Sequence, residues 1–273
     1  MGNESVKFVK QLNASRRVSA LIMLFYCLSL RVNAEASVED VHNIAEICTS
    51  VQTVMKDYSL VGMGVKFGDP PNHLKETIRK VDQDFASLKK GQHLGPELDA
   101  LVSQNEAIWK KIRSVLTQKP ERELALQLHL DIETLDKECW KIAELIAKET
   151  HIEGEHYVIV ASELGMEVQR LASLYMMKAW DVSNENYYEE VDNILVEFEA
   201  YYHELETDAY PKYISEDTKA KLDKVEKDFS VFKYMAASKS GRFVPSLGQR
   251  AARKLEKDIN EIIKQVIYAI EGV

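Results

Sequence analysis

"VHNIAEICTSVQTVMKDYSLVG", residues 41–62, is the stretch that decides the fold class. Its apolar and small residues recur at alternating intervals of three and four: Val41, Ile44, Cys48, Val51, Met55, Tyr58 and Gly62. This spacing places them on one side of an α-helix and predicts the buried seam of a helical bundle. The next residues, "MGVKFGDPP" at 63–71, contain two glycines and two prolines, so they predict a turn into a second helix.

The same pattern recurs 117 residues later without a gap, so that Gln52 aligns with Gln169 and Tyr58 with Tyr175. The apolar positions of the following helix, from Leu74 to Leu88, align with those from Val191 to Leu205. Two further helices in each half also align when the loops between them are allowed to differ in length, and Leu98 then matches Leu222 and Leu128 matches Leu255. The chain therefore reads as an internal duplication of a four-helix unit.

These observations predict an all-α fold of two tandem antiparallel four-helix bundles, one over residues 35–151 and one over 152–273. Only Gly154 interrupts the helical pattern between about Glu121 and Trp180. Because one glycine costs a helix only about 1 kcal/mol, we expect a long helix that joins the bundles and stacks them end to end. Ser183 and Ser215 are the predicted N-caps of two helices in the second half.

Residues 1–34 have the features of a secretory signal peptide. Basic residues precede the 13-residue apolar run Val18–Leu30, and "RVNA" ends the segment at Ala34. This pattern predicts cleavage after Ala34 and export to the periplasm. An uncleaved membrane anchor is the alternative, although thirteen apolar residues are short for a bilayer span.

The charge balance argues against nucleic acid and anionic lipid as partners. The predicted signal segment carries five basic residues and one acidic residue, which leaves 30 basic and 43 acidic residues and a net charge of −13 on the rest of the chain. A surface of this sign repels polyanions. Cys48 and Cys139 lie on core positions of the seam, so free buried thiols are the default, with a disulfide as the alternative in an exported protein.

The sequence holds no motif for catalysis, for a cofactor or for a metal ion. The seven histidines are scattered, and the Glu153-x-x-His156 pattern lacks the second copy that a di-iron bundle requires. The chain is therefore predicted not to be an enzyme. Arg170 is the one residue that suggests binding, because it lies beside Gln169 in the middle of a predicted core helix. It is either an exposed or snorkelling arginine or a partly buried ligand for a small anion.

The stretches "VQTVMKDYSLVGMGVKFGDPPNHLKETIRKVDQDFASLKK" and "VQRLASLYMMKAWDVSNENYYEEVDNILVEFEAYYHEL" resemble the PilJ-type domain. This domain is the sensor module of type IV pilus chemotaxis transducers and is related to nitrate-sensing bundles. The resemblance implies two tandem copies, ligand-binding positions and dimerisation through the first helix. The implied ligand-binding positions are Asn43, Gln52, Tyr58, Gln169, Arg170 and Tyr175.

Several arginine positions of the family are occupied by other residues, namely Glu46, Cys48, Thr53, Glu163 and Gly165. The resemblance thus implies an exported sensor or ligand-binding protein for signal transduction or chemotaxis, with a small molecule as its ligand, an anion among the candidates. Its partner would be a membrane chemoreceptor or a type IV pilus component. The alternative function is a structural or interaction bundle with a decayed ligand site.

Overall fold

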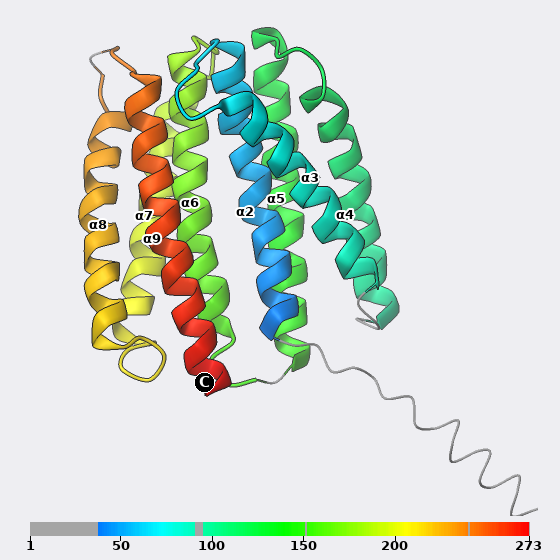
Figure 1. Ribbon diagram of the computed structural model, residues 1–273, viewed down its shortest axis with the longest axis vertical. Helices are drawn as coiled ribbons and strands as arrows, with labels where there is room; N and C mark the ends of the chain where they lie inside the picture. The colour runs from blue at the N-terminus through cyan, green and yellow to red at the C-terminus, as the bar shows by residue number, and fades with distance from the viewer. Residues whose placement is uncertain (1–37, 91–94, 151, 240, 273) are drawn as a thin grey trace, which may run out of the picture. The chain divides into compact units, whose positions relative to one another are not determined.

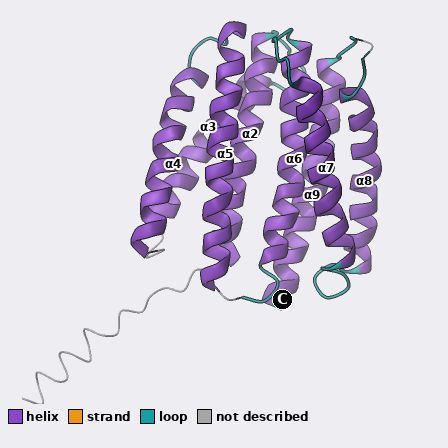
Figure 2. Ribbon diagram, turned by 180° about the vertical axis from the view of Figure 1, so that it is seen from behind, coloured by secondary structure: helices purple, strands orange, loops and turns teal. Residues whose placement is uncertain are grey.

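The computed structural model describes residues 38–90, 95–150, 152–239 and 241–272, and every regular element among them is an α-helix (Figure 1, Figure 2). The helices are α2 (Val38–Gly62), α3 (Pro70–Lys90), α4 (Gly95–Leu116), α5 (Arg122–Thr150), α6 (His156–Ala179), α7 (Tyr187–Thr207), α8 (Glu216–Ala236) and α9 (Pro245–Glu271). The all-α prediction is confirmed. The predicted signal segment, residues 1–34, lies outside the described residues.

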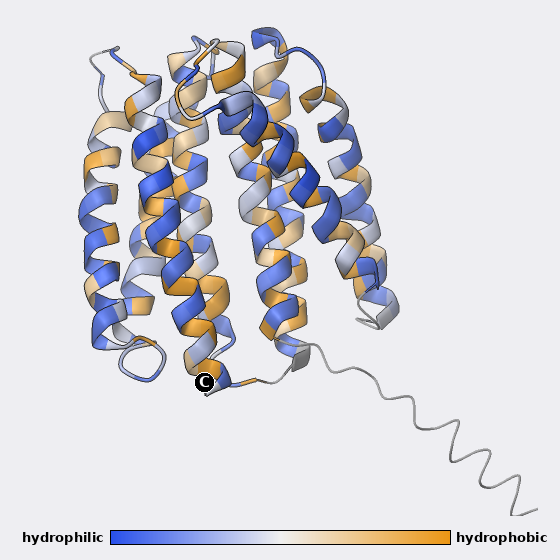
Figure 3. Cartoon of the chain, viewed as in Figure 1, coloured by the Kyte–Doolittle hydropathy of each residue, from blue (hydrophilic) through white to orange (hydrophobic). Residues whose placement is uncertain are grey.

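Helices α2 and α6 are the two inner helices. Every residue of α2 from Val51 to Leu60 is buried, and α6 is buried over most of its length. Outer helices such as α3 bury only one stripe and turn a hydrophilic face outward (Figure 3). A helix that is apolar nearly all round has to be covered on every side, and α2 is covered by α3, α5 and α6.

The helices form two groups that lie side by side. Helices α2–α5 surround one hydrophobic core and α6–α9 surround another, and the most extensive contact between any two helices joins α2 to α6. These two helices run in the same direction (Figure 1). The prediction of end-to-end stacking is wrong, because burial of both inner helices requires lateral contact. Residues 35–273 consequently belong to one compact unit, and the predicted boundary at 151/152 falls between α5 and α6.

The predicted long helix between the halves is also wrong. Helix α5 ends at Thr150, α6 begins at His156, and the chain reverses direction between them (Figure 2). Gly154 lies in this reversal with a φ of +90°, and a Cβ on it would lie 2.4 Å from the ring of Tyr213. The expected cost of about 1 kcal/mol applies to glycine inside a helix, whereas here glycine is needed for a left-handed backbone and a close approach.

The turn after α2 connects the first half to the second. Met63 and Val65 pack against the core of the second half, and Arg253 of α9 donates a hydrogen bond of 2.6 Å to the carbonyl oxygen of Gly68. Gly68 has a φ of +73°, and a Cβ on it would lie 2.3 Å from the Arg253 guanidinium. The segment "MGVKFGDPP" therefore connects the two halves, through Met63, Val65 and Gly68, as well as ending a helix.

A disulfide joins Cys48 of α2 to Cys139 of α5. The sequence favoured free thiols because both residues occupy core positions, and both are indeed fully buried. Their Cα atoms are 5.7 Å apart, which lies within the usual span of a disulfide. Heptad position predicted burial, but it could not predict that the two residues face each other.

One of the two predicted helix caps is confirmed. Ser215 is the N-cap of α8, and its hydroxyl oxygen accepts a hydrogen bond of 3.2 Å from the backbone N–H of Thr218. Helix α7 instead begins after Asn186, so Ser183 lies outside it. The asparagine-rich turn "SNEN" offers several starting residues, and burial of Tyr187 favours the later start.

Candidate functional site

Charged and amide side chains interrupt the apolar contact between the two inner helices. Gln52, Lys56 and Asp57 of α2 and Glu167 and Gln169 of α6 are all fully buried. Burial of a polar or charged group is unfavourable unless it has a partner. The partners of these residues therefore define a polar layer across the molecule, and this layer contains part of the predicted site.

Two hydrogen bonds cross directly between α2 and α6. The ammonium group of Lys56 donates to the side-chain oxygen of Gln169 at 2.8 Å, and the hydroxyl of Ser173 donates to the backbone oxygen of Gln52 at 2.8 Å. In the 117-residue alignment Lys56 corresponds to Ser173 and Gln52 to Gln169. The two bonds thus join corresponding residue pairs, although one is accepted by a side chain and the other by the backbone. The halves therefore contact each other through matching positions, as the subunits of a two-fold dimer do.

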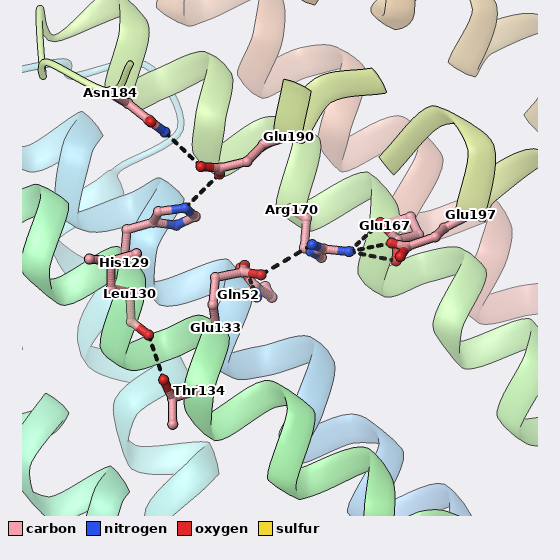
Figure 4. A network of polar contacts seen from close by, with 10 residues as sticks. All are labelled: Gln52, His129, Leu130, Glu133, Thr134, Glu167, Arg170, Asn184, Glu190 and Glu197. Carbon is pink, nitrogen blue, oxygen red and sulfur yellow. Dashed lines mark hydrogen bonds and ion pairs between the residues drawn. The ribbon is translucent and has the colours of Figure 1, made fainter. Parts of the chain in front are cut away.

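Arg170 is surrounded by three carboxylates from three helices (Figure 4). Its guanidinium lies 3.1 Å from Glu133 of α5, 3.0 Å from Glu167 of its own helix and 2.6 Å from Glu197 of α7. The side chain is only 16% exposed. The arginine is therefore neither an exposed nor a vacant cation, and an incoming anion would have to displace a carboxylate to reach it.

The acidic groups of the layer outnumber its cations, and the pKa values reflect this. Burial and, to a smaller extent, the charge of Glu133 raise the pKa of Asp136 to about 8, against the opposing effect of Arg170. Burial likewise raises the pKa of Glu167 well above its usual value, although Arg170 lowers it. At neutral pH the layer therefore holds protonated as well as ionised carboxyl groups.

Two histidines are paired at the edges of the layer. His129 of α5 lies 2.8 Å from Glu190 of α7, which also accepts a hydrogen bond of 3.1 Å from Asn184 (Figure 4). Burial opposes the charge of Glu190, but the bond to His129 leaves its pKa below the usual value. His73 of α3 pairs with the buried carboxylate of Asp57. The first pair joins two outer helices from different halves of the chain, and the second joins outer helix α3 to inner helix α2.

Tyr58 and Tyr175 lie away from this layer and have a structural role. The hydroxyl oxygen of Tyr58 accepts a hydrogen bond of 2.9 Å from the backbone N–H of Glu121, directly before α5. That of Tyr175 accepts one of 2.7 Å from the N–H of Val244, directly before α9. Each tyrosine thus fixes the start of the fourth helix of its own half.

The two aligned glutamines also contact equivalent helices. The amide nitrogen of Gln52 donates to Glu133 of α5 at 2.8 Å, and that of Gln169 donates to Glu256 of α9 at 3.3 Å. The partners of the glutamines, Glu133 and Glu256, are 123 residues apart, and so are the partners of the tyrosines, Glu121 and Val244. Both contacts therefore align α5 with α9 at an offset of 123 residues. The offset of 127 predicted from Leu128 and Leu255 is therefore wrong by about one helical turn, a shift that leaves the apolar face unchanged.

Of the predicted ligand-binding residues, the structure brings Gln52, Gln169 and Arg170 into one layer and leaves the others outside it. Asn43 is half-buried near the start of α2, nine residues before Gln52 and so about 13 Å away along the helix axis. Sequence reasoning missed the buried members Lys56, Asp57, Asp136 and Glu167, and the half-buried Glu133. The sequence signal that could have indicated this buried layer was the charged pair Lys56–Asp57 within the predicted core helix.

A partly enclosed cavity of about 150 Å³ lies beside the polar layer, between α2, α3, α6 and α9. Its polar lining includes His42, Glu46, Thr53, Lys80, Ser162 and Glu256. Glu256 connects it to the layer through its bond to Gln169. The cavity is walled by both halves of the chain, as expected for a ligand site at an interface between repeated units.

Comparison of the chain with protein-family models, with curated proteins and with solved structures finds no match. Among the residues that the structure describes, no three histidine, cysteine or acidic side chains are grouped so that they could hold a metal ion. None of the described helices has the length and apolar character needed to cross a membrane.

Proposed function

We propose that this protein is an exported, non-catalytic sensor of the PilJ type, which binds a small molecule and signals through a separate membrane partner in signal transduction or chemotaxis. The observation that carries the proposal is the cavity between α2, α3, α6 and α9. A ligand in this position would contact both halves of the chain at once. Its binding energy would therefore favour one arrangement of the halves over others, which is the requirement for a sensor.

The contact between α2 and α6 supports the resemblance to a sensor that dimerises through its first helix. These helices are the first of each half, and hydrogen bonds between corresponding residue pairs join them. We propose that the second half takes the place of a second subunit within one chain. Sedimentation equilibrium tests this idea, because a monomer at micromolar concentration supports it, whereas a tight homodimer favours dimerisation through the first helix of each chain.

A thermal-shift screen of the purified chain from Glu35 onward tests the ligand-binding proposal. The screen contains nitrate, nitrite and other small anions, amino acids, and small amines at matched ionic strength. A ligand at 100 times its dissociation constant stabilises the folded state by about 2.7 kcal/mol, which a melting curve resolves easily. A flat response to every class would contradict the proposal.

The alternative function, a structural or interaction bundle with a decayed ligand site, is favoured by one observation. Arg170, the residue best suited to bind an anion, already has three carboxylate partners. Under this alternative the screen stays flat, and replacement of residues that line the cavity leaves every partner interaction unchanged.

Export is tested separately. The chain is expressed with its native N-terminus, and the cell is divided into periplasmic, membrane and cytoplasmic fractions. A periplasmic product whose N-terminal residue is Glu35 supports cleavage after Ala34. A membrane-bound product that begins at residue 1 or 2 supports the anchor instead.

A further inference from the structure

Four of the five hydroxyl groups around the cavity between α2, α3, α6 and α9, those other than Ser50, already donate their protons within their own helices. Each donates its hydrogen to the backbone carbonyl four residues earlier: Thr49 at 3.1 Å, Thr53 at 3.2 Å, Thr77 at 3.0 Å and Ser162 at 2.7 Å. A hydroxyl has one proton and two lone pairs. What these four side chains can still offer to a ligand is therefore hydrogen-bond acceptors.

The carboxylates of the lining add negative charge. Glu256 uses one oxygen to accept from Gln169 at 3.3 Å, and Glu46 accepts from Lys80 at 2.6 Å. Lys80 is the cation of the lining, but it also pairs with Asp84 at 2.9 Å, so two carboxylates share its charge. Glu256 has no cation within ion-pair distance among the described residues.

The two histidines of the lining do not reverse this balance. His73 is paired with the buried carboxylate of Asp57. His42 lies 4.0 Å from Glu46, and its other ring nitrogen, Nδ1, is buried with no hydrogen-bond partner in the described part of the chain. An unpartnered imidazole nitrogen can serve a ligand as an acceptor or, when protonated, as a donor.

From this lining we infer that the cavity binds a small organic cation, with a primary ammonium group directed at Glu256 and the Thr53 and Ser162 hydroxyl oxygens. The inference rests on the proposed ligand-binding function and assigns its ligand class. An ammonium group carries three donors and no acceptor, which complements a lining where acceptors predominate and where Asn260 and Ser50 add the remaining donors. An anion would face lone pairs and an unpaired carboxylate, so the same lining disfavours it.

The size of the cavity limits the ligand to about six non-hydrogen atoms. An apolar cavity of about 150 Å³ in another protein holds one benzene molecule, and the cavity here has the same volume. Ala45, Gly165 and Ile263 supply an apolar part of the wall. A short alkyl chain behind the ammonium group fits both the volume and this mixed lining.

The experiment compares three four-carbon probes with different polar groups: n-butylammonium chloride, sodium butyrate and 1-butanol, with sodium chloride as the ionic-strength control. The chain from Glu35 onward is titrated at pH 7 and followed by its melting temperature and by the ring-proton NMR signals of its histidines. We expect butylammonium alone to raise the melting temperature and to shift the signals of His42 and His73. The signals of His129, His156 and His203, which lie outside the lining, should stay unchanged.

A matched pair of variants on α9 tests the contact itself. Glu256→Gln keeps the shape and the acceptor for Gln169 but removes the charge, and we expect butylammonium to bind at least about tenfold more weakly, since hydrogen bonds to charged groups are worth about 1.5–3 kcal/mol. Glu261→Gln removes a charge of the same helix that pairs with Lys221 outside the cavity, and binding should be unchanged.

The outcomes separate this inference from the function on which it rests. Butyrate or butanol binding that shifts His42 and His73 would overturn the cationic ligand class and leave ligand binding standing. The cationic ligand class is likewise overturned if all three probes fail while the wider screen finds an anion as the ligand. If the probes and the wider screen all fail, both proposals are overturned.

Discussion

Tyr58 and Tyr175, 117 residues apart, make the same hydrogen bond in the two halves of the chain. Each hydroxyl oxygen accepts from the backbone N–H directly before a fourth helix, at 2.9 Å from Glu121 and 2.7 Å from Val244. A backbone N–H at a helix start has no partner within the helix. The repeated tyrosine meets this need in both halves, so its recurrence in the sequence has a structural cause.

Tyr58→Phe and Tyr175→Phe should each destabilise the fold by about 1 kcal/mol, because each removes one hydrogen bond from a buried site. The two losses should be similar and should add in the double variant, because the tyrosines serve separate helices. Urea unfolding measures them. Tyr234→Phe, at a side chain that is 81% exposed, is the control and should change nothing. A loss in only one half would contradict the equivalence of the two bonds.

Lys56→Met should destabilise the fold by about 1–3 kcal/mol, because it leaves the buried oxygen of Gln169 without a donor. The double variant Lys56→Met with Gln169→Leu should recover much of this loss, because replacing both partners by apolar groups of similar size removes the unsatisfied group. Chemical unfolding of the four proteins completes a double-mutant cycle. Additive effects of the two substitutions would show that the bond contributes no coupling.

Arg170→Ala should be the most destabilising of the charge substitutions, at about 3–5 kcal/mol near neutral pH, because it leaves buried carboxylates without their cation. The loss should shrink at pH 5, because Glu167, whose pKa is raised by burial, is then more fully protonated and needs no cation. Arg122→Ala is the matched control, since Arg122 is 49% exposed and pairs at 3.5 Å with an exposed aspartate. Equal effects of the two substitutions would argue against the network in Figure 4.

The stability of the protein should fall as the pH rises from about 5 to 8. Asp136 has a pKa raised to about 8 by burial, so the folded protein holds a proton there that the unfolded chain has lost. When the pKa of a group is higher in the folded protein than in the unfolded chain, its full contribution to stability is present at pH values below the unfolded-state pKa. This contribution is lost progressively as the pH rises from the unfolded-state pKa to the folded-state pKa. Each such proton contributes a slope of about 1.4 kcal/mol per pH unit.

Asp136→Asn keeps the shape of the protonated carboxyl group and cannot titrate. Its unfolding free energy should therefore depend less steeply on pH between 5 and 8 than that of the unchanged protein, by about one proton. Urea unfolding at four pH values gives the slopes. Asp131→Asn, at a half-buried position of the same helix where the side chain accepts a hydrogen bond from Gln127, should leave the slope unchanged. Identical slopes for all three proteins would exclude a protonated Asp136.

Reduction of the Cys48–Cys139 disulfide should destabilise the fold by about 4–5 kcal/mol on the chain-entropy estimate, because the bond closes a loop with a sequence separation of 91 residues. Unfolding in the presence and absence of a reductant measures this difference. Thiol titration of the unfolded chain from Glu35 onward should find no free thiol before reduction. Two free thiols there would mean that the cysteines remain unlinked.

The sequence by itself determined the helices and their repetition. Apolar residues at intervals of three and four define which face of each helix is buried, and this local periodicity does not depend on the rest of the fold. It was enough to predict an all-α chain, the repeat of 117 residues, and the equivalence of Gln52 with Gln169 and of Tyr58 with Tyr175.

Only the tertiary structure decided how the halves meet, because periodicity specifies a buried face but not what covers it. The lateral contact of α2 with α6, the reversal at Gly154 and the Cys48–Cys139 disulfide all depend on which faces come together. The same holds for Arg170, whose neighbours Glu133 and Glu197 come from two other helices. The neighbours of a charged residue in the folded protein determine whether its charge is already paired or is available to bind a ligand.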